Sequence, residues 1–156
     1  MIDLFKPVTR KDFKRMSTLV TDEKDHFFVF PSATYPMTVS QIKERVENKK
    51  EFIMIEEDAE LIGFANLYDD EAKEHVFIGN FVIAKRYRAK GYGTKLITHM
   101  IALAREKYQL SEIRISVVST NTKAFSWYAQ LGFKPYSVEV LDTPALKFIH
   151  MKMTLD

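Results

Sequence analysis

The chain has 156 residues, 46% of them hydrophobic, and a formal net charge of +2 at pH 7. This length suits one domain with a sizeable core, and charged residues interrupt the apolar segments well before the length of a membrane span. The charge balance gives no support to nucleic-acid binding, and the absence of cysteine excludes disulfides, thiolate metal sites and cysteine nucleophiles. We therefore expect a single domain over residues 1–156 that binds no metal and no membrane. Because the start lacks the pattern of a secretion signal, we expect a cytoplasmic protein.

The first quarter of the chain predicts a strand, a helix and a loop. Residues 2–7 have strand character, and Thr9 is a typical N-cap for a helix with an apolar face at Phe13 and Met16. Residues 22–37 mix acids and aromatic residues with two prolines, which break regular structure. We therefore interpret this stretch as a loop.

The middle of the chain predicts a helix followed by three strands. Thr38 and Gln41 have the spacing of a capping box, so a second helix is expected up to about residue 49. Three apolar segments separated by short acidic turns then predict an antiparallel meander, with strands at residues 51–57, 61–68 and 75–84.

The last third of the chain predicts two more helices and three more strands. An amphipathic helix pattern follows Gly93, and a strand is expected at residues 113–118. A helix over residues 121–131 has Gly132 at its C′ position, before closing strands at residues 134–140 and 145–153. The predicted order is β-α-α-β-β-β-α-β-α-β-β.

The turn between the fourth strand and the third helix, Arg88 to Gly93, is the clearest indication of function. Gly91 and Gly93 allow a tight turn and close approach of a ligand to the backbone. The first N–H groups of the following helix lack intrahelical acceptors, and together with the helix dipole and the charges of Arg88, Lys90 and Lys95 they favour a phosphate or pyrophosphate.

Other interpretations of this turn are weaker. Gly93-Thr94-Lys95 lacks both the glycine spacing and the following hydroxyl of a P-loop. A dinucleotide-binding fingerprint requires a third glycine where this chain has Leu96. The glycines could also serve only to join a strand to a helix, and each cation could belong to a solvated face.

Two motifs in this order resemble the GNAT superfamily of acyl-CoA-dependent N-acetyltransferases. Its cofactor signature is matched by Arg88, Gly91 and Gly93, and its second element by Asn121, Ala124, Tyr128, Gly132 and Phe133. Ala89 stands where a glycine is frequent, and Lys85 where a proline is common. The resemblance implies an α/β (α+β) fold: a mixed, mostly antiparallel, twisted sheet of about seven strands flanked by four helices.

The resemblance also implies acetyl-CoA as co-substrate and assigns residues to it. Backbone groups of the fourth strand would pair with the pantetheine amides, a backbone N–H near Ile83 would polarise the thioester carbonyl, and residues 88–94 would hold the pyrophosphate. The implied cofactor-binding residues are Phe81, Val82, Ile83, Arg88, Ala89, Lys90, Gly91, Tyr92, Gly93, Thr94, Asn121, Lys123 and Tyr128.

Tyr128 is the implied general acid for the departing thiolate. A phenol with a pKa of about 10 can donate to a thiolate whose conjugate acid has a pKa of about 8.5, although the transfer is uphill. From spacing alone, Tyr128 is also a good core residue on the apolar face of its helix.

The general base is not evident from the sequence. Two positions where some family members have a glutamate are Phe77 and Ser116 here. Glu74 is a possible base at the start of the same strand, next to His75. By resemblance to ribosomal-protein N-terminal acetyltransferases, whose counterpart looks placed to do so, Asn80 could hold a water. Each of the three also has a plain structural role available in a turn, a sheet edge or a bulge.

By the same resemblance, the acceptor amine would bind between residues 22–37 and the loop at residues 141–144. The first segment has Asp22, Glu23, Asp25 and His26 among aromatic residues, a composition that suits a cationic amine but is also ordinary for a loop. We expect an N-acetyltransferase that moves an acetyl group to a primary amine, on a small molecule or a protein, by direct attack in a ternary complex. The alternative is a non-catalytic acyl-CoA-binding or sensing module. A homodimer is expected from family habit only.

Overall fold

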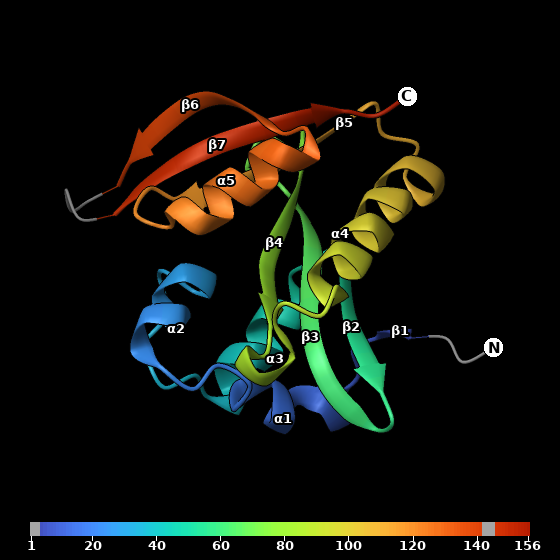
Figure 1. Cartoon of the computed structure of the whole chain (residues 1–156), viewed down its shortest axis with the longest axis vertical. Helices are drawn as coiled ribbons and strands as arrows, with labels where there is room; N and C mark the ends of the chain where they lie inside the picture. The colour runs from blue at the N-terminus through green and yellow to red at the C-terminus, as the bar shows by residue number, and fades with distance from the viewer. Residues whose placement is uncertain (1–3, 142–145) are drawn as a thin grey trace.

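In the computed structural model, which describes residues 4–141 and 146–156, seven strands form one mixed sheet in the order β1-β2-β3-β4-β5-β7-β6 (Figure 1). All neighbouring strands are antiparallel except β4 and β5, which are parallel. The predicted sheet, including the β2-β3-β4 meander, is confirmed. The strands are β1 Phe5–Pro7, β2 Glu51–Glu57, β3 Glu60–Asp69, β4 Val76–Ile83, β5 Glu112–Val118, β6 Lys134–Val140 and β7 Lys147–Thr154.

The described part of the chain has five α-helices rather than the predicted four. The additional helix, α2, lies inside residues 22–37, which the sequence predicted as a loop. Asp22 caps it, because its side chain accepts a hydrogen bond from the Asp25 N–H at 2.8 Å, and two acids in its first turn favour the helix dipole. The prolines that suggested a loop lie beyond its end. The helices are α1 Phe13–Ser17, α2 Glu23–Val29, α3 Val39–Glu47, α4 Tyr92–Ala102 and α5 Thr122–Leu131.

Several helix ends follow the sequence closely. The Thr38 and Gln41 capping box is present, with the Gln41 N–H donating to the Thr38 hydroxyl at 3.1 Å. The helix predicted from Thr9 begins as a 3-10 turn, Arg10–Asp12, and α4 continues into a π-helical segment, Leu103–Lys107. Gly132 ends α5 with φ 112°, the left-handed conformation that glycine adopts most easily.

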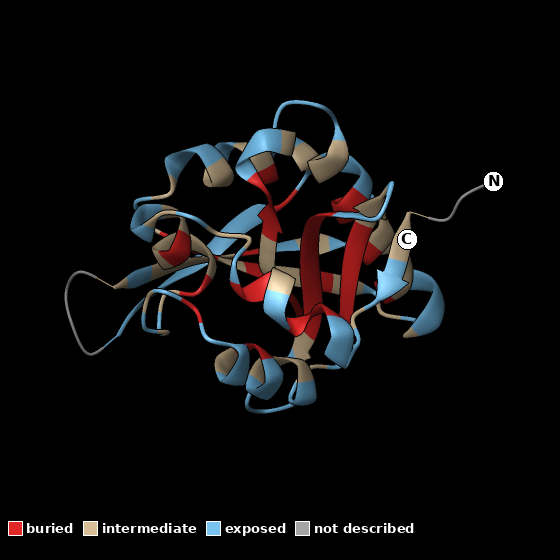
Figure 2. Ribbon diagram, turned by 90° about the horizontal axis from the view of Figure 1, so that it is seen from below, coloured by how far each residue is buried: buried red, intermediate tan, exposed pale blue. Residues whose placement is uncertain are grey.

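The core has two parts, one on each face of the sheet. One buried cluster contains Leu96 and Met100 of α4, Tyr128 of α5, and inward residues of the strands such as Ile115. The other packs Met16, Phe30 and Ile42 from the N-terminal helices against Phe64 and its neighbours on β2, β3 and β4. Figure 2 shows the buried residues concentrated on the central strands and on the helix faces turned toward them. The sheet is therefore covered on both faces.

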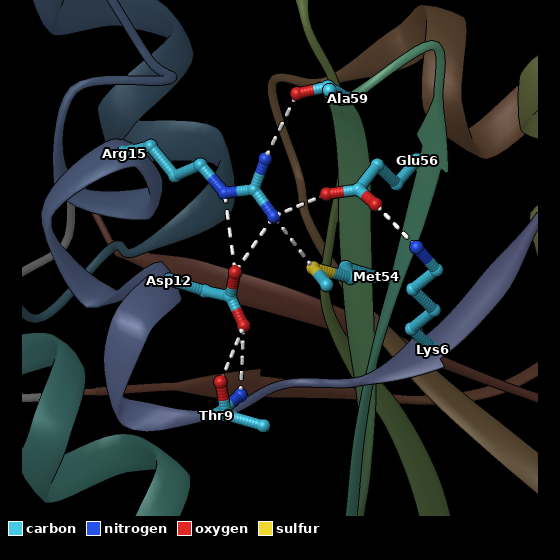
Figure 3. A network of polar contacts seen from close by, with 7 residues as sticks. All are labelled: Lys6, Thr9, Asp12, Arg15, Met54, Glu56 and Ala59. Carbon is cyan, nitrogen blue, oxygen red and sulfur yellow. Dashed lines mark hydrogen bonds and ion pairs between the residues drawn. The ribbon is translucent and has the colours of Figure 1, made fainter.

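A polar network ties the N-terminal helices to the edge of the sheet (Figure 3). The Arg15 guanidinium lies between the buried Asp12 carboxylate, at 2.6 Å, and Glu56 of β2, at 2.5 Å. Burial opposes ionisation of Asp12, but hydrogen bonds from Thr9 and Arg15 outweigh it and hold the Asp12 pKa below its ordinary value. Lys6 of β1 pairs with the same Glu56 at 2.6 Å. These contacts join the segment before α1 and α1 itself to the strands β1 and β2.

Candidate active site

The parallel strands β4 and β5 separate soon after they meet. They pair only at Phe77 with Arg114 and at Ile78 with Ile115, although β4 continues to Ile83 and β5 to Val118. The β3–β4 register also shifts in this stretch, as expected of a bulge. A cleft of about 1210 Å³ lies at the separation and is lined by both strands and by α2, α4 and α5. The sheet itself is therefore open where the predicted site residues lie.

The N-terminus of α4 at one side of this cleft is free to bind an anion. Gly91 is the N-cap, with φ 89°, and the first hydrogen bond runs from the Lys95 N–H to the Gly91 carbonyl at 3.2 Å. The N–H groups of residues 92–94 therefore have no acceptor within the helix. A Cβ added at Gly91 would meet no atom within 4 Å, so its outer side is open. These features fit the pyrophosphate of a coenzyme A thioester.

Most of the residues predicted to bind the cofactor line the cleft. They are Phe81, Val82, Ile83, Arg88, Ala89, Gly91, Gly93, Thr94, Asn121, Lys123 and Tyr128. Lys90 and Tyr92 are not among the lining residues: Lys90 lies over the Tyr87 ring at 6.0 Å, and the Tyr92 hydroxyl donates to Glu57 at 2.7 Å. The backbone N–H of Tyr92 still belongs to the free first turn of α4.

Asn121 has a structural role in addition to the predicted one. As the N-cap of α5, its side-chain oxygen accepts from the Ala124 N–H at 3.3 Å. The side chain also lines the cleft, where Lys123 is exposed beside it. The cap therefore fixes the orientation of Asn121 at the position implied for a pantetheine contact.

Two acids predicted for amine recognition instead pair with cations of the turn before α4. Asp25 of α2 contacts Arg88 at 3.0 Å, and Asp22 contacts Lys85 at 3.0 Å. Arg88 also donates from Nε to the Ile83 carbonyl at 3.0 Å. The other two candidates are less available: Glu23 is exposed and does not line the cleft, and the buried His26 lies 3.0 Å from the Ala33 carbonyl. The second predicted acceptor segment lies outside the described residues from position 142 onward.

Tyr128 is buried at the wall of the cleft. Its ring packs at 6.5 Å from Phe81, 5.2 Å from Trp127 and 5.8 Å from Phe133, measured between ring centroids. Burial raises the pKa of the Tyr128 phenol well above its ordinary value, so the hydroxyl stays protonated over the usual pH range. Within the described residues, the Tyr128 hydroxyl has no hydrogen-bond partner. It is therefore available to a ligand in the cleft.

The residues considered as a general base or water holder are differently placed. The Asn80 amide donates to the Val29 carbonyl at 2.8 Å and accepts from Asn66 at 2.8 Å, in a backbone conformation with φ 43°. One lone pair of its oxygen is left for a water. Glu74 is exposed and does not line the cleft; its N–H donates to the Asp70 side chain. His75 also lies outside the lining, where its Nδ1 is 3.0 Å from the Asp70 carboxylate.

The structure adds a polar group that sequence reasoning missed. Ser116 Oγ lies 2.6 Å from His150 Nδ1, and His150 Nε2 lies 2.7 Å from Glu139 Oε1. All three side chains line the cleft, as does Tyr68, whose pKa burial raises to about 12. The sequence signal was weak, because Ser116 and His150 are 34 residues apart and only the β5–β7 register makes them direct partners.

Two further observations concern metals and membranes. Within residues 4–141 and 146–156, no group of three or more histidine, aspartate or glutamate side chains is placed to hold a metal ion. No helix in the same ranges has the length and apolar character needed to cross a bilayer.

The chain belongs to the acetyltransferase (GNAT) family, whose family model matches residues 16–133. A 31% identity over 83 residues links it to the spermine/spermidine N(1)-acetyltransferase of Bacillus subtilis (strain 168). That match covers 49% of this chain and 55% of the relative. The chain thus spans just over half the length of this curated relative.

Solved structures match over nearly the whole chain. The ribosomal-protein-alanine N-acetyltransferase from Brucella melitensis has a TM-score of 0.79 at 16% identity, covering 97% of this chain and 99% of that one. A chimera of the Vibrio cholerae spermidine N-acetyltransferase SpeG and hSSAT has a TM-score of 0.77 at 17% identity, covering 96% and 93%. At these identities the likeness concerns the fold.

Proposed function

We propose that this protein is an acetyl-CoA-dependent N-acetyltransferase that acts on a primary amine by direct attack within a ternary complex, with Tyr128 as the general acid. The observation that carries the proposal is that one cleft joins the free N-terminus of α4 to the unpaired Tyr128 hydroxyl through the opening between β4 and β5. A ligand with an anionic end and a reactive end some distance away fits this arrangement.

The donor half of the site would hold acetyl-CoA, which supplies the activated acetyl group as a thioester. The free N–H groups of residues 92–94 at the start of α4 and the Arg88 guanidinium, which lines the cleft, would bind the pyrophosphate. The length of β4 beyond Ile78 has no pairing with β5, so its backbone is available to the amides of the pantetheine arm, in the manner of an added strand.

Tyr128 would supply the proton that the leaving sulfur needs. Its buried hydroxyl stays neutral at physiological pH and has no competing protein acceptor among the described residues. A group buried in this way loses little energy to solvent reorganisation when it donates. The transfer is uphill, and its cost is smallest when the negative charge on sulfur is greatest, so the phenol acts at that stage of the reaction.

The acceptor half of the cleft is acidic at the end near the β3–β4 turn. Asp69, Asp70, Glu71 and Glu139 all line it. Asp69 pairs with Lys50 at 3.4 Å, Asp70 with His75 and Glu139 with His150. Among the described residues this leaves Glu71, which makes no ion pair, to attract a cationic amine. A polyamine is therefore the first acceptor to test, in agreement with the activity named for the Bacillus relative.

Calorimetry with acetyl-CoA, followed by measurement of thiol release with amines, tests the proposal. Spermidine, an aminoglycoside, free amino acids and a short peptide with a free N-terminus cover the acceptor classes. We expect micromolar acetyl-CoA binding and thiol release with at least one amine. Binding without release for every amine would favour the non-catalytic acyl-CoA-binding alternative, and absence of binding would contradict both.

A further inference from the structure

Three side chains form a continuous hydrogen-bonded line across β5, β7 and β6. Ser116 and His150 are direct cross-strand partners, with 2.6 Å between Oγ and Nδ1. On the other side of the ring, His150 Nε2 is 2.7 Å from the Glu139 carboxylate. The proposed function leaves this line without a role, although all three residues line its cleft.

The partners of His150 fix where its proton lies. An ionised carboxylate can only accept hydrogen bonds, so Nε2 carries the proton and donates it to Glu139. Nδ1 of the neutral ring is then an acceptor, and the Ser116 hydroxyl donates to it. The Ser116 side chain also hydrogen-bonds the Tyr68 hydroxyl, so one lone pair of its oxygen remains to accept a proton from a group in the cleft.

Ser116 lies at the point where the sheet opens. It follows Ile115, the last residue of β5 that pairs with β4. Ile115 and Val117 pack in the same core cluster as Tyr128, so strand alternation places Ser116 on the opposite face of the sheet. Tyr128 and the Ser116–His150 pair therefore approach the opening from opposite faces of the sheet. Separate groups are thus placed to take a proton from the amine and to give one to the sulfur.

The line also has an exit to solvent. The His150 side chain is 16% exposed, whereas Glu139 at the far end is 50% exposed. The His150 ring is edge-on to Phe77, which lines the cleft, and stacks on Tyr136, with 6.1 Å between ring centroids in each case. These two ring contacts restrict the orientation of the imidazole.

We propose that Ser116, His150 and Glu139 form the proton-accepting chain for the acceptor amine; this inference rests on the proposed N-acetyltransferase function. The ammonium gives a proton to Ser116 Oγ while the Ser116 hydroxyl proton moves to His150 Nδ1. Glu139 stabilises the resulting imidazolium, which returns its proton to solvent.

The bonds and protons of the reaction then balance. The neutral amine nitrogen forms a bond to the acetyl carbon as the carbon–sulfur bond breaks. Tyr128 protonates the sulfur, and the second proton lost by the nitrogen returns through solvent to the Tyr128 oxygen. The sum is ammonium plus acetyl-CoA giving the amide, coenzyme A and one released proton, which is the proton that passes through His150.

Other ionisable groups lie around this histidine. Glu139 and Tyr136 contact its ring, Tyr68 and Asp70 line the same cleft, and Arg114 and Lys152 lie over the Tyr136 ring. Tyr68 is no alternative base, because burial raises its pKa to about 12 and keeps it protonated. Arg114 donates a hydrogen bond to the Tyr136 hydroxyl at 3.0 Å rather than to His150.

The proposed role of Ser116, His150 and Glu139 is tested by measuring thiol release from acetyl-CoA with spermidine, from pH 6 to pH 10, for the 156-residue protein. We expect His150→Gln to lower kcat by about 100-fold near pH 7, the effect typical of losing a general base. The deficit should shrink toward pH 10, because an alkyl ammonium with a pKa of about 10.4 then loses its proton unaided. Ser116→Ala should show the same pH dependence, and Ser116→Thr, which keeps the hydroxyl, should restore activity.

His75→Gln is the matched control, because His75 also contacts a carboxylate but lies outside the cleft lining. Its pH profile should equal that of the wild type. Calorimetry should show the same acetyl-CoA affinity for wild type and for every variant. The proposal would be overturned if His150→Gln lowered kcat by the same factor at every pH. It would also be overturned if His150→Gln kept the kcat of the wild type near pH 7.

Imidazole ¹⁵N NMR of the acetyl-CoA complex tests the proposal without turnover. It distinguishes failure of the relay from failure of the proposed function, which would show as no thiol release by the wild type. The relay requires His150 to be the Nε2–H tautomer, with an Nδ1 resonance that shifts in Ser116→Ala. An Nδ1–H tautomer would overturn it, because that nitrogen could then not accept a proton.

Discussion

Arg88 and Asp25 form an ion pair, with 3.0 Å between Nη2 and Oδ2, that joins α2 to the turn preceding α4. The pair spans 63 residues of sequence and is partly exposed, with 42% of the Arg88 side chain and 22% of the Asp25 side chain accessible. The cation implied for the pyrophosphate is therefore also paired with a carboxylate of the protein.

Asp25→Asn should strengthen acetyl-CoA binding. Without the carboxylate, the Arg88 charge acts undivided on the pyrophosphate, and a repulsive charge at the cleft is removed. Since partly exposed pairs contribute up to about 1 kcal/mol, we expect the acetyl-CoA Kd to fall by roughly 3- to 5-fold. Calorimetry at low ionic strength is the appropriate measurement.

Glu23→Gln is the control for that change, because it removes the same charge from the same helix at an exposed residue that does not line the cleft. Its Kd should stay close to that of the wild type. Weaker binding in Asp25→Asn would mean instead that Asp25 holds Arg88 in its binding orientation.

Ala89→Gly should stabilise the fold. Ala89 has φ 61°, a left-handed conformation that costs an alanine about 1 kcal/mol or more relative to glycine. The greater freedom of glycine in the unfolded chain offsets part of this gain, so we expect a rise of about 0.5 kcal/mol in the free energy of unfolding by urea. Ala59→Gly, at φ 63° and distant from the cleft, should behave alike. Destabilisation at position 89 alone would show that its methyl group makes a compensating contact.

Tyr128→Phe should lower kcat by about 100-fold with little change in acetyl-CoA affinity, because only the proton donor is lost while the ring packing remains. Steady-state thiol release combined with calorimetry separates the two quantities. Tyr108→Phe is the control, since the Tyr108 hydroxyl donates to Glu51 outside the cleft. Equal losses in kcat and in acetyl-CoA affinity would contradict the assignment of Tyr128 as the general acid.

Asp12→Asn should destabilise the protein in a pH-dependent manner. The folded-state pKa of Asp12 lies below its ordinary value, so its contribution is present above about pH 4 and is lost as pH falls further. Urea unfolding at pH 7 should show a loss of about 2 to 3 kcal/mol, the range for a hydrogen bond to a buried charge, and a smaller loss at pH 3. Glu47→Gln, on an exposed helical pair, should change stability by less than about 0.5 kcal/mol at either pH. A loss at Asp12 that is independent of pH would contradict the assignment.

The sequence predicted the strands well, because the central strands are buried on both faces and so form short apolar segments separated by short turns. It missed α2, where seven residues are too few to show helical periodicity and the nearby prolines dominated the interpretation. The Asp22 cap was the available signal, since its side chain and the Asp25 N–H have the spacing of an N-cap contact.

The donor half of the candidate site was predictable because its residues are close in sequence and bind through backbone geometry. Ser116, His150 and Glu139 were not, because they come from three strands whose register the sequence does not specify. The pairing of Asp25 with Arg88 was missed for the same reason: it depends on how α2 docks beside β4.

A crystal structure of the protein with acetyl-CoA would test the central claim most directly. The account predicts the pyrophosphate on the N–H groups of residues 92–94, the pantetheine arm along β4 beyond Ile78, and the thioester sulfur within hydrogen-bond reach of the Tyr128 hydroxyl. Acetyl-CoA bound outside the opening between β4 and β5, or with its sulfur remote from Tyr128, would contradict it.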